Sequence, residues 1–218
     1  MKAQRPAEAQ HRAMAARQGF NALRGAIFSS KYLSQKDKLT IASACVHSRA
    51  LHGSGTWTDL TATARQAVSA AYMSSLKRIF GFKFELGQTP PSDQQLCQSL
   101  GVPVLEAALV SERLLQLSRI VLSGPNYLWS LIQASSGSEW RRAVSQDLAS
   151  VAQTLAPKSD ALGSPHTCWH IWQGFIFDYP CAWRALVREF ARTFRAALAS
   201  PDAAPPPRFA CDLLCSAV

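Results

Sequence analysis

Residues 51–84 read LHGSGTWTDLTATARQAVSAAYMSSLKRIFGFKF. The stretch contains a glycine turn that ends at a tryptophan, a long amphipathic segment and a basic end, KRIFG. Apolar residues recur in the segment at spacings of three and four, the repeat of one helix face. They are Leu60, Ala64, Val68, Tyr72, Leu76 and Ile79. The pattern predicts a helix that buries this face.

Both ends of this segment carry residues that are typical of helix termini. Thr58 or Asp59 can cap the start, because a short side-chain oxygen accepts hydrogen bonds from the first-turn N–H groups. Gly81 follows the last apolar position, where glycine adopts the left-handed conformation that closes a helix. Lys77 and Arg78 lie in the last turn, next to the negative end of the helix dipole. We therefore expect a well-formed helix that stops at the glycine.

The rest of the chain repeats the helical pattern and shows neither an internal repeat nor a convincing alternating strand. Further helices are expected at about 6–28, 34–51, 92–101, 103–124, 138–157 and 181–199. The sequence predicts an all-α, irregular multi-helix bundle with three parts. These are a helical unit at 1–123, an aromatic-rich helical region at 124–200 and a proline-rich tail at 201–218.

Composition describes a globular protein with an uneven charge. The 218 residues are 48% hydrophobic and 17% charged, and the formal net charge is +9. Residues 1–123 hold 15 Lys and Arg against 7 Asp and Glu, whereas residues 124–218 hold 8 against 7. Such a basic surface attracts phosphate backbones or anionic membranes, although a solvated basic face explains it equally well.

The sequence also indicates where the protein is located and whether its cysteines form disulfides. No apolar run approaches the roughly 18 residues of a membrane span, and the N-terminus lacks the apolar middle of a signal peptide. We therefore expect an intracellular protein that does not span a membrane, with the nucleus among its locations. The six cysteines are too few and too scattered for a disulfide scaffold.

Four features follow one another between His11 and Trp129. They are FNALRGAIFSS (20–30), LSQKDKLTIASACVHSRALHGSGTW (33–57), KRIFG (77–81) and SERLLQLSRIVLSGP (111–125). Their order resembles the region after the polymerase palm in non-LTR (LINE-type) retrotransposon reverse transcriptases. Leu51, Gly53 and Trp57 are similar to the family's L-x-Y-G-x-x-x-W pattern, and KRIFG is similar to its R-R-I-L-G.

The resemblance implies that residues 1–123 are a helical thumb, the part that grips the template–primer duplex in that family. The chain departs from the family's pattern at three places. His52 stands where an aromatic residue is usual, Gly55 stands where an acidic residue is frequent, and Gly124–Pro125 replaces Gly-His.

Catalysis is not expected from this chain alone. Polymerase chemistry needs carboxylates that hold two metal ions close together on the transferring phosphate. The eight aspartates include no adjacent pair, and no Phe/Tyr-x-Asp-Asp sequence is present. We therefore expect a palm-less, retroelement-derived fragment with no enzymatic activity and no cofactor, and with RNA or DNA as its partner.

Six cations are the predicted phosphate contacts of such a fragment. They are Arg12, Arg17, Arg24, Lys77, Arg78 and Lys83. Trp57 and Tyr72 are aromatic residues that could stack on bases, but the position of Tyr72 on the apolar stripe favours the core. A second basic row, at residues 184, 188, 192 and 195, could meet RNA or an acidic partner helix.

A metal site is the weakest of the hypotheses. RFACDLLCSAV (208–218) resembles the opening of a Cys2His2 zinc finger, with Cys211 and Cys215 as its thiols. His166 and His170, four residues apart, could share a metal with this pair. We expect ordinary half-buried histidines instead, and no tightly held metal.

The alternative function is a helical protein–protein interaction module. Tryptophan is enriched at interface hot spots, and the C-terminal half contains Trp129, Trp140, Trp169, Trp172 and Trp183. On this hypothesis a protein partner docks on the tryptophan-rich half, and binding depends little on salt.

Overall fold

The computed structural model describes residues 4–58, 60–81, 91–134, 138–154, 162–165 and 168–197. Within these ranges all regular secondary structure is helical and no strand occurs, so the predicted all-α class is confirmed. The helices are α1 (Gln4–Leu23), α2 (Gln35–Ala42), α3 (Ser48–Ala50), α4 (Ala62–Phe80), α5 (Asp93–Leu100), α6 (Leu105–Ser123), α7 (Asn126–Ala134), α8 (Glu139–Thr154), α10 (Trp169–Asp178) and α11 (Pro180–Ala197). Short turns are η1 (Arg24–Phe28) and η2 (Ser43–His47), both π-helical, and the 3₁₀ turn η3 (Ser54–Thr56). The predicted tail at 201–218 lies outside the described residues.

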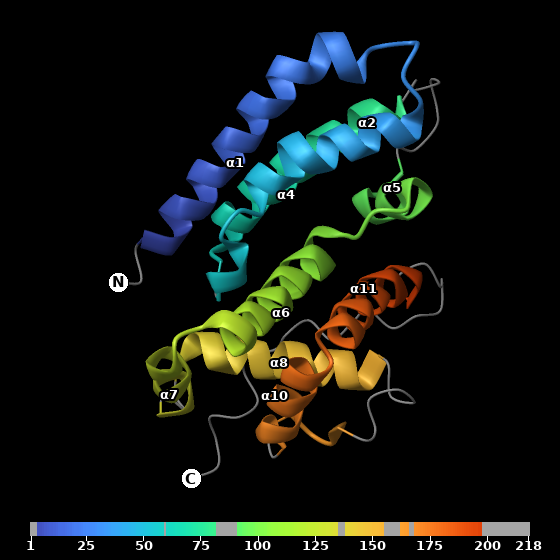
Figure 1. Ribbon diagram of the computed structural model, residues 1–218. Coiled ribbons are helices and arrows are strands. Elements are labelled where there is room, and N and C mark those ends of the chain that lie inside the picture. The colour runs from blue at the N-terminus through green and yellow to red at the C-terminus, as the bar shows by residue number, and fades with distance from the viewer. Residues whose placement is uncertain are drawn as a thin grey trace.

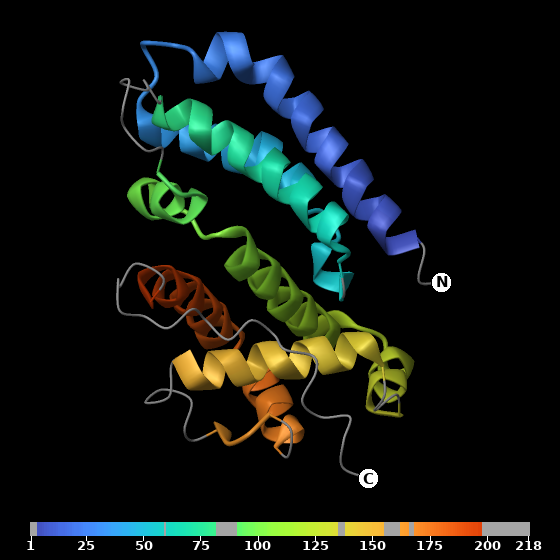
Figure 2. The same cartoon turned by 180° about the vertical axis from the view of Figure 1, so that it is seen from behind.

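The helices form two groups, one above the other in Figure 1 and again in the reverse view of Figure 2. In the upper group, α1 packs along α4, and the continuous segment α2–η2–α3 packs against both. In the lower group, α6 packs against α8, α10 and α11. The turn η3 lies against α6 and so connects the two groups.

The core follows the same division. One hydrophobic cluster includes Tyr72 of α4, and the other includes Trp172 of α10. Helix α6 contributes to both, because Leu109 belongs to the first cluster and Leu114 to the second. One helix therefore holds the two groups together, and the domain boundary at residue 123 stays a prediction.

Helix α4 begins later than its sequence indicates. The predicted cap at Thr58 or Asp59 is wrong: Thr61 is the N-cap, and its side chain accepts a hydrogen bond from the Ala64 N–H at 3.2 Å. Thr61 has the same short side-chain oxygen, so the sequence offered three caps within four residues. The C-terminal prediction is confirmed, since Gly81 has φ +71° and ends the helix.

The predicted starts of α2 and α5 are confirmed, whereas the predicted start of α6 is wrong by two residues. Ser92 and Gln95 form the predicted capping box at the start of α5, and Ser34 caps α2. The helix expected from Pro103 instead begins at Leu105. This small difference matters for the site, because the Pro103 carbonyl is thereby free to accept from the Tyr72 hydroxyl at 2.9 Å.

Candidate functional site: an arginine-lined groove

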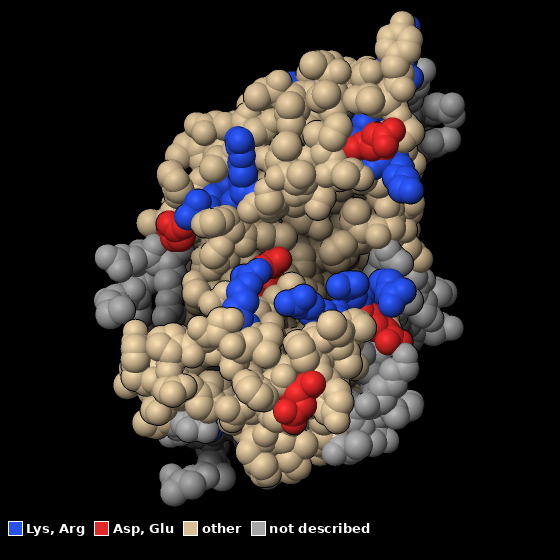
Figure 3. Space-filling model, in the orientation of Figure 1, with Lys and Arg blue, Asp and Glu red and all other residues tan. Residues whose placement is uncertain are grey.

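A groove of about 550 Å³ lies between the two groups of helices. Its upper wall comes from α2, η2, Leu51 and α4, and its lower wall from α6, the two residues Val102 and Pro103 ahead of it, and α11. Figure 3 shows the same face hollowed near its centre, with basic side chains gathered beside the hollow. Apolar side chains make most of the lining, including Leu39, Leu51, Val102, Pro103, Leu115 and Val187.

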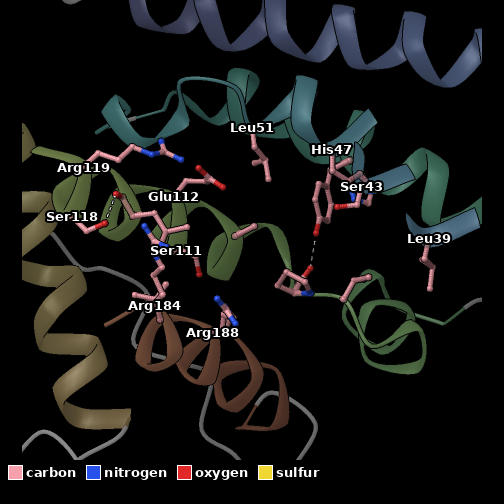
Figure 4. Close-up of a pocket in the computed structure, with 17 residues that line it drawn as sticks. Leu39, Ser43, His47, Leu51, Ser111, Glu112, Ser118, Arg119, Arg184 and Arg188 are labelled. Carbon is pink, nitrogen blue, oxygen red and sulfur yellow. Dashed lines mark hydrogen bonds between the residues drawn. The ribbon is translucent and has the colours of Figure 1, made fainter. Parts of the chain in front are cut away.

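Three arginines from two helices meet at this groove. Arg184 and Arg188 reach into it from α11, and Arg119 reaches it from the neighbouring α6 (Figure 4). Glu112 is the carboxylate in the lining. Arg119 donates from Nη1 to Gln116 Oε1 at 3.2 Å. In the part of the chain that the structure describes, Arg184 and Arg188 have neither hydrogen bond nor ion pair, so their guanidinium groups remain available to a ligand.

Glu112 balances one of these charges only in part. Burial raises the pKa of its carboxyl group, and the nearby Arg119 opposes that rise. With three guanidinium groups against one carboxylate, the groove carries a positive charge. Because low-dielectric walls focus the field of such a cleft, it attracts anions.

The upper wall is closely packed and uncharged where His47 lies. The imidazole Nε2 is 2.9 Å from Ser75 Oγ, and the ring stacks on Tyr72 with centroids 4.3 Å apart. Burial lowers the pKa of His47 to about 4, so the side chain is neutral near pH 7. Burial also raises the pKa of Tyr72, which keeps its hydroxyl protonated. This wall gives shape to the groove and no charge.

The six cations predicted as phosphate contacts lie elsewhere, and none of those described lines the groove, whereas Arg184 and Arg188 of the predicted second basic row do. Arg12 donates to Glu8 Oε1 at 2.7 Å, one turn away on α1. Lys77 pairs with Asp93 Oδ1 at 2.7 Å, and Arg78 donates to Ser29 Oγ at 2.7 Å. The contacts of Lys77 and Arg78 are exposed and that of Arg12 is partly buried, so each contributes little to stability and leaves a cation at or near the surface.

Of the remaining predicted cations, Arg17 and Arg24 lie within the described residues and Lys83 does not. Arg17 and Arg24 are exposed on the first helical segment. Ser29 joins Arg24 to Arg78, since its hydroxyl donates to the Arg24 carbonyl at 2.8 Å and accepts from the Arg78 guanidinium. The ends of η1 and α4 therefore meet and form a second basic area. Lys83 lies outside the described residues.

Two predicted base-stacking residues are in the core. Trp57 is 3% exposed and Tyr72 is 2% exposed, so neither ring can stack on a base. The stacking hypothesis is wrong for both, and the alternative assignment of Tyr72 to the core is confirmed. Trp57 is buried because the turn that contains it packs against α6, a contact that no local pattern reveals.

The metal hypothesis gains no support from the described part of the chain. His166, Cys211 and Cys215 lie outside it. His170 is exposed on α10, not half-buried as expected. Among the described residues, no group of three or more His, Cys, Asp or Glu side chains is placed to hold a metal ion, and the described cysteines form no disulfide with one another.

The tryptophans of the alternative hypothesis differ in accessibility. Trp172 and Trp183 are both 0% exposed, so they are core residues and not docking anchors. Trp129 and Trp169 are half-buried and stack with ring centroids 6.1 Å apart. Trp140 is also half-buried, and its Nε1 donates to the Gly55 carbonyl at 2.8 Å.

The sequence predicts the basic row that includes Arg184 and Arg188, but neither the part of Arg119 nor the groove itself. Arg184 and Arg188 are visible as a row at helical spacing, and Arg119 is visible as a cation off the apolar face of its helix. Nothing local indicates that these rows face each other, since 65 residues separate Arg119 from Arg184. Only the packing of α11 on α6 brings them together.

Compared with known proteins, the chain matches no family model, and no curated protein or solved structure is significantly similar to it. Of the helices that the structure describes, none has both the length and the apolar character needed to cross a membrane.

Proposed function

We propose that this chain is a thumb-like, retroelement-derived fragment that binds RNA or DNA with little sequence preference and has no catalytic activity. The observation that carries the proposal is the meeting of Arg119, Arg184 and Arg188 at one groove beside a single carboxylate. Guanidinium groups suit phosphate because their planar fork offers two parallel donors. The second basic area, around Arg24 and Arg78, extends the cationic surface.

Little sequence preference is expected because the available donors are suited to phosphates. Phosphate contacts fix the position of a protein on nucleic acid but carry no sequence information. The described part of the groove holds no paired carboxylates for metal-assisted phosphoryl transfer, since Glu112 is the acidic side chain in its lining. Primer extension is therefore not expected.

The test measures the affinity for fluorescent RNA and DNA oligonucleotides by anisotropy across a range of salt concentrations. Affinity should fall linearly on a log–log plot, because phosphate binding releases condensed counterions. R184Q/R188Q should weaken binding to all sequences alike, whereas K36Q/R142Q, which removes two exposed cations outside the groove, should not. R24Q/R78Q measures the contribution of the second basic area, around Arg24 and Arg78, to the affinity. Absence of salt-dependent binding would refute the proposal.

A module that docks a protein partner is the second candidate function. Its anchors would be exposed tyrosine and phenylalanine side chains in place of the predicted tryptophans. Tyr127 is 70% exposed, and Phe177 and Tyr179 are each 61% exposed. Such side chains are enriched at interfaces. Binding of a protein partner that is insensitive both to salt and to R184Q/R188Q would favour this function.

A further inference from the structure

We propose that the groove selects single-stranded over double-stranded nucleic acid, by taking an unstacked base between the two groups of helices while Arg184, Arg188 and Arg192 hold the strand's phosphates. This inference rests on the proposed function and specifies its ligand. The resemblance to a polymerase thumb implies a grip on a duplex, so the inference makes a different statement about what the groove holds.

The size and lining of the groove fit one nucleobase with its sugar. Its volume of about 550 Å³ lies within the ~300–1,000 Å³ typical of small-molecule pockets. Leu51, Pro103 and Leu115 offer apolar contact to the faces of a base. Ser43 and Ser111 add hydroxyl groups to the lining, and a hydroxyl oxygen can accept a hydrogen bond from any base that presents a donor.

A duplex cannot use this lining. Its bases stay inside the stack and expose only their edges, in the grooves of the duplex, so no base face can reach the apolar lining of a concave site. Single strands differ, because their bases can be splayed out and stacked on guanidinium planes or packed on apolar surface. The apolar part of the groove therefore contributes binding energy for a single strand and none for a duplex, while the arginines serve both.

The arginines of α11 continue the groove as a track for the backbone. Arg184, Arg188 and Arg192 follow one another every fourth residue and are all exposed. Successive members are about 6 Å apart along the helix axis, a distance of the same order as that between neighbouring phosphates of an extended strand. The first two line the groove and the third lies beyond the lining. A strand with one base in the groove can thus place its next phosphates on this row.

The experiment compares a 12-nucleotide single strand with the corresponding duplex, for RNA and for DNA, at matched salt. The single strand should bind the full chain at least tenfold more tightly. For the single strand, R184Q/R188Q should reduce the slope of log affinity against log salt by about 1.4, the value for two lost phosphate contacts on a single strand. K36Q/R142Q should leave the slope unchanged.

A second variant tests the apolar part without changing charge. Ala191 is half-buried in the lining, so A191W should fill the groove and remove most of the preference for the single strand. Ala185 is exposed on the same helix outside the lining, so A185W is the matched control and should keep the preference. Circular dichroism verifies that both variants are as helical as the parent chain.

The outcomes separate this inference from the function on which it rests. Equal affinity for single strand and duplex, with normal salt dependence, would overturn the inference and leave nucleic-acid binding intact. An unchanged preference in A191W would also overturn it. Loss of binding in R24Q/R78Q but not in R184Q/R188Q would place the ligand on the second basic area, against the inference. Failure of every oligonucleotide to bind would refute the proposed function itself.

Discussion

Arg113 donates two hydrogen bonds to the Asp147 carboxylate, from Nε to Oδ2 at 2.6 Å and from Nη2 to Oδ1 at 2.9 Å. Asp147 is 1% exposed, and its burial raises the pKa of the carboxyl group while Arg113 opposes that rise. The remaining guanidinium nitrogen, Nη1, donates to the Trp57 carbonyl at 3.3 Å. One side chain of α6 therefore holds both α8 and the turn that precedes α4.

Removing one partner of this ion pair should destabilise the fold strongly. In R113M the Asp147 carboxylate stays buried without its cation, a change that costs about 3–5 kcal/mol in comparable cases. R113M/D147L should recover much of that loss, because no charge is then left in the core. Urea unfolding of the parent, the two single variants and the double variant measures the coupling; additive losses would show that the two side chains do not act as a pair.

Acid should destabilise the chain through His47. Burial lowers its folded-state pKa to about 4 from the usual 6.5, so between these values the unfolded chain binds the proton more readily than the folded one. Stability is therefore kept above pH 6.5 and falls as the pH decreases toward 4. At 1.36 kcal/mol per pH unit the loss amounts to about 3 kcal/mol.

The variant H47L should lack this part of the acid response. Its free energy of unfolding, measured between pH 7.5 and 4, should depend less steeply on pH than that of the parent chain. The same steepness in both proteins would show that another group is responsible. Its stability at pH 7.5 gives the separate cost of losing the imidazole contact with Ser75.

Gly55 should not tolerate a side chain. A Cβ at this position would lie 2.7 Å from Gln116 Cβ and 2.8 Å from the Glu112 carbonyl oxygen, because η3 touches α6 there. G55A should therefore destabilise the chain by about 1–3 kcal/mol, as overpacking does in other cores. A methyl group added at Gly174 of α10 would meet no neighbour within 4 Å, so G174A should be neutral or stabilising by up to ~1 kcal/mol. Thermal unfolding compares the two; equal effects would contradict close packing at Gly55.

The cap of α4 can be tested at Thr61. Since its side chain accepts from the Ala64 N–H, T61A should lower the unfolding free energy by about 1 kcal/mol. Thr63 is exposed in the first turn of the same helix, and T63A, which replaces it by a better helix former, should not destabilise the chain. A larger loss in T63A than in T61A would show that the helix does not depend on this cap.

Helices were predictable from the sequence because their causes are local. The repeat of Ala64, Val68 and Leu76 follows from the 3.6-residue turn, and each of these side chains is buried. The capping box of α5 and the glycine that ends α4 need only neighbours within a few residues. Where several caps are equally good, as at the start of α4, the sequence does not choose among them.

The groove and the roles of the aromatic residues were decided by contacts between distant segments. Trp172 and Trp183 are candidate docking anchors on the alternative hypothesis, but both are core residues because α10 and α11 pack on α6. Arg119 and Arg184 face one groove only because the same packing sets their helices side by side. Helix periodicity states which residues share a face, whereas burial and charge clustering depend on which faces meet, and this is determined by the shape and packing of the whole chain.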